Sequence, residues 1–132
     1  MATSLPDAAA GGFDRLYGGV LTGVAAGLVT AEVPVREALL GPSGELHGGV
    51  YAALAESAAL AGTRCAIPAG DGSSARAIAN VLSLLAPVLQ GAVHARAVRR
   101  HAGRTTSVWE VEMTDDGGRR CAVARVTVAV GD

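Results

Sequence analysis

One short segment of the chain carries residue types that could act together on a carbonyl compound. His47, Gly48 and Gly49 precede a run of small apolar residues, and Glu56 is the only charged side chain in that run before Arg64. Backbone N–H groups at the start of a helix stabilise negative charge that develops on a carbonyl oxygen, aided by the helix dipole. Gly48 has no side chain to block that approach. Glu56 supplies a carboxylate that either activates water as a general base or attacks directly as a nucleophile, and the sequence leaves both roles open.

These residues can act together only if a helix begins at the His-Gly-Gly turn. The pattern predicts a helix from Gly48 to about Ala66, because six alanines between positions 52 and 61 favour helix and the segment has almost no polar face. A helix that is apolar nearly all round is a buried helix. The Gly- and Ser-rich segment from Pro68 to Ser74 ends it. We therefore expect Glu56 to lie on a buried helix, where an unpaired carboxylate is rare unless it is functional.

Strand patterns lie on both sides of this helix. A segment that alternates around Pro34, from about Val24 to Val35, predicts one strand before it. Further strands are predicted after it at 78–85, 93–98, 108–113 and 123–130, with a hairpin turn at 115–118. The order of strand, helix and four-stranded meander predicts an α+β fold, in which one antiparallel sheet wraps around one long helix. Trp109 and Met113 are expected to pack in its core.

The chain has the length of one domain. With 132 residues, a domain can bury about two thirds of the surface that its unfolded chain exposes. We predict a leader at residues 1–12, a short turn of helix near Phe13–Tyr17, and a single domain over residues 13–132.

Composition argues against several classes of partner and site. The formal net charge is −1, so the chain lacks the cationic field that nucleic-acid and membrane-surface binders need, and we expect no nucleic acid and no membrane partner. Cys65 and Cys121 are far apart and have no metal-ligand spacing, which predicts two buried reduced thiols and no metal site. The amino-terminal residues lack the basic and apolar regions of a signal peptide, which favours a cytoplasmic location.

A cluster of arginines follows later in the chain. Arg96, Arg99, Arg100 and Arg104 lie in a stretch without acidic residues. Guanidinium groups suit phosphate oxygens, so at least one of them is a candidate to bind the phosphates of a coenzyme A group. Strand alternation prevents all four from pointing the same way. The alternative is a solvated charged face, which is the usual place of such residues.

Helix geometry indicates that the site is shared between two chains. Gly48 and Glu56 are eight residues apart, which is about 12 Å along a helix that rises about 1.5 Å per residue. One chain cannot easily place both groups on one carbonyl. A twofold dimer with antiparallel helices would bring Glu56 of one chain beside Gly48 of the other.

The segment Leu46–Ser57, together with Phe13–Leu16 and Ala31–Val35 upstream, resembles hotdog-fold acyl-CoA thioesterases. The nearest types are the phenylacetate-pathway and the Glu-dependent 4-hydroxybenzoyl-CoA thioesterases, and the resemblance spans residues 13–130. It implies a hotdog fold and hydrolysis of an acyl-CoA or acyl-carrier thioester without a cofactor. It also implies that the Gly48 N–H binds the thioester oxygen, that Glu56 does the chemistry, and that the protein is a homodimer or a homotetramer built as a dimer of dimers.

The resemblance also suggests which residues surround the substrate. The chain departs from the family at Gly41, where Asn or Gln is frequent, and at Leu60, where Glu-dependent members carry Thr. A further hydroxyl position of the family falls on Ala77, with Ser74 nearby. These departures bear on how the attacking water is held. With His47 as a further catalytic candidate, the predicted substrate-binding residues are Gly49, Gly41, Leu60, Ser74, Arg104, Thr105 and Arg100.

Two other functions stay open on the sequence. A non-catalytic acyl-CoA-binding module is favoured by Gly41 and Leu60 and opposed by Glu56. A hotdog dehydratase or hydratase would pair a His with a carboxylate at a differently built site, and no His follows His47 until His94. Ser-His-Asp hydrolase chemistry is disfavoured because the chain has no Gly-x-Ser-x-Gly elbow and is too short for that fold.

Overall fold

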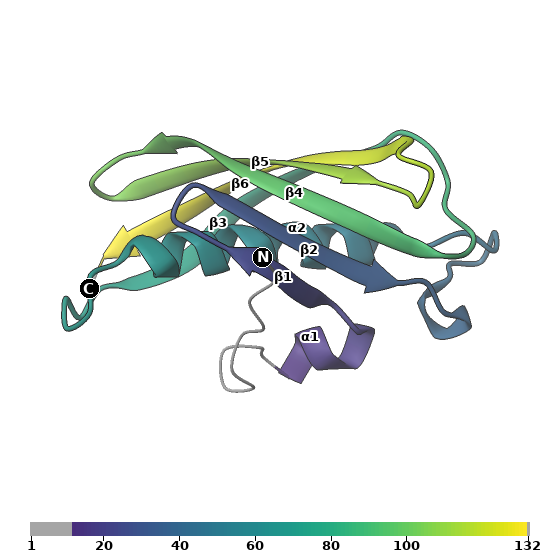
Figure 1. Cartoon of the computed structure of the whole chain (residues 1–132), viewed down its shortest axis with the longest axis horizontal. Helices are drawn as coiled ribbons and strands as arrows, with labels where there is room; N and C mark the ends of the chain where they lie inside the picture. Colours follow the sequence, from purple (N-terminus) through teal and green to yellow (C-terminus); the bar gives the residue numbers. More distant parts are fainter. Residues whose placement is uncertain (1–11, 132) are drawn as a thin grey trace.

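A six-stranded antiparallel sheet curves around one long helix (Figure 1). The computed structural model describes residues 12–131. The strand order is β1-β2-β4-β5-β6-β3. The elements in chain order are α1 (Gly12–Tyr17), β1 (Val20–Val24), β2 (Leu28–Pro34), the short 3-10 helix η1 (Glu37–Leu39), α2 (Gly48–Ala66), β3 (Ser74–Leu84), β4 (Ala92–Ala102), β5 (Thr106–Thr114) and β6 (Arg120–Gly131). This arrangement confirms the predicted α+β fold. Apart from Gly12, the predicted leader lies outside the described residues.

The strand prediction was wrong in two respects. The segment before α2 forms two strands, because the chain turns back between Val24 and Leu28, where the Ala25 N–H donates to the Leu28 carbonyl at 3.0 Å. The four later strands do not form one meander. Only β4, β5 and β6 follow each other, whereas β3 pairs with β6 at the far edge of the sheet. Alternation along a segment predicts that it is a strand, but it contains no information about which strand lies beside it.

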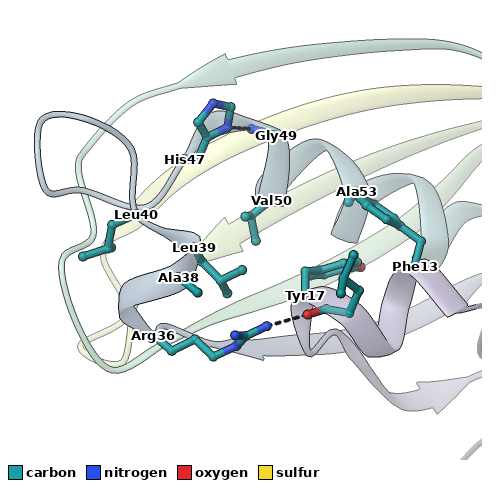
Figure 2. A pocket seen from close by; sticks show the side chains of 11 residues that line it. Phe13, Tyr17, Arg36, Ala38, Leu39, Leu40, His47, Gly49, Val50 and Ala53 are labelled. Atoms are coloured by element: carbon teal, nitrogen blue, oxygen red, sulfur yellow. Dashed lines mark hydrogen bonds between the residues drawn. The ribbon is translucent and has the colours of Figure 1, made fainter.

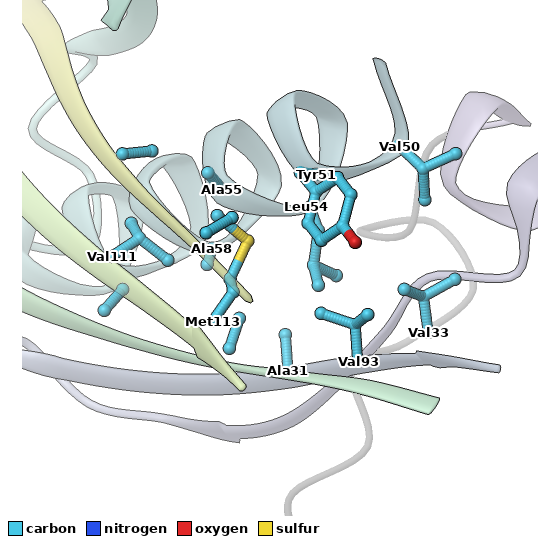
Figure 3. Packing of buried hydrophobic residues seen from close by; sticks show 14 of the residues in the cluster. Ala31, Val33, Val50, Tyr51, Leu54, Ala55, Ala58, Val93, Val111 and Met113 are labelled. Carbon is cyan, nitrogen blue, oxygen red and sulfur yellow. The ribbon is translucent and has the colours of Figure 1, made fainter. Parts of the chain in front are cut away.

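The core lies between the concave face of the sheet and the inner side of α2 (Figure 3). Leu54, Ala55 and Ala58 of α2 pack there against strand valines. Trp109 and Met113 are both fully buried, which confirms their predicted place in the core. Of the two thiols, Cys121 is buried as predicted. Cys65 is exposed, contrary to the prediction, because it lies in the last turn of α2, where Arg64 and Ala66 are exposed as well.

Trp109 is held against the carboxyl-terminal half of α2. Its indole N–H donates to the Thr63 hydroxyl at 2.9 Å, and that hydroxyl donates to the Ala59 carbonyl at 2.8 Å. The ring lies directly over Gly62. A Cβ at Gly62 would stand 2.5 Å from Trp109 Cζ2 and 2.9 Å from Val29 Cγ2. The sheet approaches α2 this closely only because position 62 has no side chain.

We expect Gly62→Ala to destabilise the protein even though alanine is the better helix former. The helix preference favours the variant by about 1 kcal/mol. Overpacking against a rigid buried indole costs about 1–3 kcal/mol or more, and here both Trp109 and Val29 would have to move. Urea denaturation should therefore show a net loss of about 1–2 kcal/mol. As a control, Gly27→Ala lies in open space and should change stability by less than about 0.5 kcal/mol. A Gly62→Ala protein as stable as its parent would contradict this account of the contact.

Candidate active site

The His47 turn presents a free backbone N–H at the start of α2. His47 is the N-cap residue, and its Nδ1 accepts a hydrogen bond from the Gly49 N–H at 2.9 Å (Figure 2). Its own N–H donates to the Leu39 carbonyl at 3.0 Å, and its carbonyl accepts from the Val50 N–H at 3.0 Å. His47 thus shapes the turn with both its side chain and its backbone. Among residues 12–131, no hydrogen-bond acceptor is found for the Gly48 N–H, which leaves this group available to a ligand.

Glu56 lies on an exposed strip of α2. The expectation of a helix buried nearly all round is wrong for the single chain, because the sheet covers only part of the helix surface. Glu56 is exposed, and no ion pair to it is found within the described part of the chain. The strip has β3 on one flank, where Asn80 Nδ2 donates to the Ala52 carbonyl at 3.0 Å. On the other flank is α1, where the Ser57 hydroxyl donates to Asp14 Oδ1 at 2.6 Å.

Tyr17 is a residue near Glu56 that sequence reasoning missed. Its side chain is buried, and burial raises the pKa of its hydroxyl, an effect that the Ser57 hydroxyl partly offsets and that the Asp14 and Glu56 carboxylates reinforce. The phenol therefore stays neutral over the physiological pH range. In the sequence, the only indication of Tyr17 was that it is an aromatic residue at the end of the short helix predicted at Phe13–Tyr17.

Asn80 is a second residue that was missed. It lies on β3 and points toward α2, and its Oδ1 is buried without a partner in the part of the chain that the structure describes. Ala52, which accepts the hydrogen bond from Asn80, lies one helical turn before Glu56. The sequence held little signal for this residue, because an Asn inside an apolar strand segment is compatible with either face.

The remaining predicted site residues form two groups. Gly41 lies next to the His47 ring, since a Cβ at Gly41 would be 3.7 Å from His47 Cδ2, and Leu60 is half-buried one turn after Glu56. Ser74 and Thr105 lie instead at the end of β6. The Ser74 hydroxyl donates to the Gly131 carbonyl at 3.1 Å, and the Thr105 carbonyl accepts from the Val130 N–H at 2.9 Å. One chain therefore does not gather all the predicted residues around Gly48.

The four clustered arginines do not all point the same way, as strand alternation predicted. The Arg99 guanidinium lies 5.1 Å from the centre of the buried Trp109 ring. Arg100 pairs with Glu110, with Nε 3.3 Å from Oε2, and lies with Arg96 in a hollow on the outer face of the sheet. Arg104 lies exposed in the turn between β4 and β5, next to Thr105. Of the four arginines, Arg104 lies nearest the carboxyl-terminal end of β6, where Ser74 and Thr105 form their hydrogen bonds.

Comparison with known proteins decides the family. Residues 43–122, which include the whole segment from His47 to Glu56, match the family model described as "Thioesterase superfamily". The chain belongs to this family. It is 33% identical over 122 residues to a 1,4-dihydroxy-2-naphthoyl-CoA hydrolase of Listeria monocytogenes, covering 90% of this chain and 95% of the relative. It is 35% identical over 112 residues to the proofreading thioesterase EntH of Klebsiella pneumoniae, covering 84% of this chain and 80% of the relative.

A solved structure agrees with this assignment. A mutant of the thioesterase PA1618 from Pseudomonas aeruginosa superposes with a TM-score of 0.88 at 28% identity, covering 95% of this chain and 90% of that one. The resemblance to hotdog thioesterases and the hotdog fold are thereby confirmed. The chain is an enzyme of the thioesterase class, and this counts against the non-catalytic acyl-CoA-binding module. Within residues 12–131, no helix is long and apolar enough to cross a membrane.

Proposed function

We propose that this enzyme hydrolyses an acyl-CoA or acyl-carrier thioester, with the Gly48 N–H and Glu56 at the centre of a site shared by two chains. The observation that carries this proposal is the free N–H of Gly48 at the start of α2, two turns before a carboxylate on an exposed strip of the same helix. Both groups lie within the residues that match the family.

The proposed reaction uses these two groups at successive stages. With Glu56 as general base, its carboxylate takes a proton from water while the water oxygen bonds to the thioester carbon. Charge then moves to the carbonyl oxygen, where the Gly48 N–H and the α2 dipole stabilise it. The C–S bond breaks, and the thiolate takes the proton from Glu56 to give free acid and thiol. With Glu56 as nucleophile, the carboxylate displaces the thiolate to form an anhydride, which water then hydrolyses. The Gly48 N–H at the helix start and the exposed Glu56 carboxylate are compatible with either route.

The free edge of β3 supports a second copy as the other half of the site. In the described chain β3 pairs only with β6, so its other edge has no strand beside it. Ile78 and Val81 on this strand are 55% and 67% exposed. A long apolar edge strand is a template for pairing with another chain. We infer that two copies pair through their β3 strands.

A twofold axis at this edge would bring the two halves together. Gly48 lies at the Leu84 end of β3, since a Cβ on Gly48 would be 3.1 Å from Leu84 Cδ1, whereas Ala52 is bonded to Asn80. Ala52 lies midway between Gly48 and Glu56 in the helix. An axis that passes close to Asn80 would therefore bring Glu56 of one chain to Gly48 of its partner. It would also bring the partner's β3 start, with Ser74, Arg104 and Thr105 nearby, to the same end, where these residues suit the coenzyme A or carrier phosphates.

The direct test is to assay the purified protein with a panel of aryl and aliphatic acyl-CoAs and to follow the release of free thiol. Turnover with saturation kinetics is the expected result. Saturable binding of acyl-CoA without turnover would support the acyl-CoA-binding module instead. If the protein neither hydrolyses nor binds any acyl-CoA of the panel, the proposed substrate becomes a carrier-bound thioester. An acylated, phosphopantetheinylated carrier protein would then be the substrate to assay. A cytoplasmic location stays a prediction from the sequence.

Charges on the β3 edge are expected to separate the two chains. Replacing Ile78 and Val81 together with Lys should convert a dimer or tetramer into smaller species, because lysines on an edge strand oppose its pairing with a second strand. Thiol release should fall with dissociation. Sedimentation velocity measures the first effect, and Val20→Lys on the opposite edge strand β1, where Val20 is 50% exposed, is the matched control. A double variant that keeps its parent's size and activity would contradict pairing through β3.

A further inference from the structure

A β-bulge in the edge strand β3 turns the side chain of Asn80 toward α2. The register of β3 against β6 shifts between Ala77 and Ala79, so one extra residue is inserted there. Ala77 and Leu82 both pack against the core although they are five residues apart. A regular strand would place residues at that odd spacing on opposite faces. The bulge therefore brings Asn80 onto the helix side of the sheet, and re-aiming a side chain is a common role of bulges near functional sites.

The Asn80 amide binds the helical turn that carries Glu56. Its Nδ2 donates to the Ala52 carbonyl at 3.0 Å. Within an α-helix the same carbonyl accepts the N–H of the residue four positions on, which is Glu56. Only the NH₂ side of the amide can face a carbonyl oxygen, so this contact also fixes the orientation of the amide. Asn80 thus shares a hydrogen-bond acceptor with the backbone of Glu56.

This amide lowers the stability of the fold at its position. Its Oδ1 is buried and has no hydrogen-bond donor within residues 12–131. A buried acceptor without a donor is destabilising, and an apolar side chain of similar size could pack between β3 and α2 without that loss. A polar residue that breaks a packing rule next to a proposed reacting group indicates a functional role.

We propose that Asn80 is a positioning residue, which ties the turn carrying Glu56 to the strand through which the two chains pair. The inference rests on the proposed function, in which the twofold axis passes close to Asn80. Sliding α2 along β3 by one residue would move Glu56 by about 1.5 Å. The symmetry would move Gly48 of the partner subunit by the same amount in the opposite direction, so the error in their separation doubles. The bond from Asn80 to Ala52 opposes this slide at its midpoint.

Asn80→Leu and Asn80→Gln form a matched pair of tests. Leucine has nearly the size of asparagine and no donor, whereas glutamine keeps an amide donor that can reach the Ala52 carbonyl. Asn80→Leu should lower kcat for thiol release about ten- to hundredfold, since small misplacements of reacting groups cost up to about 10²-fold. KM should stay within about twofold of the parent value, because substrate binding is not removed. Asn80→Gln should keep most of the parent kcat.

The stability of Asn80→Leu separates a positioning role from a structural one. In urea the variant should be at least as stable as its parent, because the buried Oδ1 without a donor is gone. Sedimentation velocity should show the parent's size at the protein concentration of the assay. A residue that only supports the fold would lose activity together with stability or assembly.

Asn80→Cys tests where the twofold axis lies. At the axis the two copies of residue 80 would be directly opposite on paired strands, with Cβ atoms about 4.5–5.5 Å apart, which a small adjustment brings into disulfide range. In a Cys65→Ser background, which removes the exposed thiol, mild oxidation should therefore crosslink the two chains on a non-reducing gel. The control is Ser83→Cys on the same strand. Its copies would be six residues apart along the pair, about 20 Å, and should not crosslink.

The outcomes distinguish this inference from the proposed function. A parent that hydrolyses no thioester would overturn the proposed function and this inference with it. An active parent whose Asn80→Leu variant keeps its kcat, or loses stability or assembly along with it, would overturn the positioning role alone. Crosslinking through Ser83→Cys and not through Asn80→Cys would place the axis elsewhere on β3 and overturn the coupling through Asn80.

Discussion

Replacing Glu56 with glutamine is expected to lower kcat for thioester hydrolysis by about 10²–10⁴, the usual contribution of one general acid–base group. Glutamine keeps the shape of the side chain and removes its charge, so it can neither take a proton from water nor attack the carbonyl. Because Glu56 is exposed and no ion pair to it is found in residues 12–131, the substitution should leave stability and assembly unchanged. Thiol release with the best substrate of the panel measures the effect, and circular dichroism with sedimentation checks the fold.

Mixing two inactive variants would test whether the site is shared. Gly48→Pro removes the N–H donor, and proline is well tolerated at the first position of a helix. The preceding His47 has φ −65° and ψ 136°, the extended conformation that a residue before proline prefers. A mixed dimer of Glu56→Gln and Gly48→Pro chains would contain one intact site and one without either group. We expect refolded mixtures to regain a substantial part of the parent activity.

Two results would contradict this account of catalysis. A Glu56→Gln protein with nearly full activity would exclude the carboxylate from the chemistry. Variants that are each inactive and stay inactive in verified mixed dimers would place Gly48 and Glu56 in sites that each chain completes alone, contrary to the distance between them along α2.

Replacing Trp109 with alanine is expected to cause the largest loss of stability of any substitution considered, about 3–5 kcal/mol. Trp109 is fully buried, packs on Gly62, lies under the Arg99 guanidinium and donates a hydrogen bond to Thr63. Alanine would leave a cavity between the sheet and α2 and would leave Thr63 without that donor. Since domains of this size are stable by about 5–15 kcal/mol, the variant should lose a large fraction of its stability. Urea denaturation measures the change.

Combining Trp109→Ala with Gly62→Ala would test whether the contact between the indole and position 62 accounts for the stability loss of Gly62→Ala. Without the indole, a methyl group at position 62 no longer overlaps with it and instead fills part of the cavity. The double variant should therefore be more stable than the sum of the two single losses predicts, because contacting residues are not additive. Strict additivity would mean that Gly62 and Trp109 do not constrain each other. A loss below about 1 kcal/mol for Trp109→Ala would show that the core repacks around the gap.

The sequence by itself determined the elements whose formation depends on neighbouring residues. Helix α2 begins and ends where the His-Gly-Gly turn, the alanine run and Pro68 predicted, because capping and helix preference act within a few residues. The turn at 115–118 formed as expected, with Gly118 at φ +83°, a conformation that glycine adopts at little cost. The candidate groups Gly48 and Glu56 were likewise identified from local spacing and from the resemblance to the thioesterase family.

Only the tertiary structure decided which surfaces these elements share. In the structure β3 lies at the edge of the sheet beside β6, and Glu56 lies on an exposed strip of α2. Asn80 contacts the helical turn that precedes Glu56. Residues of α1, η1 and α2, which are separate in the chain, together line one apolar pocket. Periodicity reports whether a side chain faces inward or outward, but strand order and the contacts between distant segments depend on how a sheet closes around a helix. That closure is a property of the whole chain, so no local pattern encodes it.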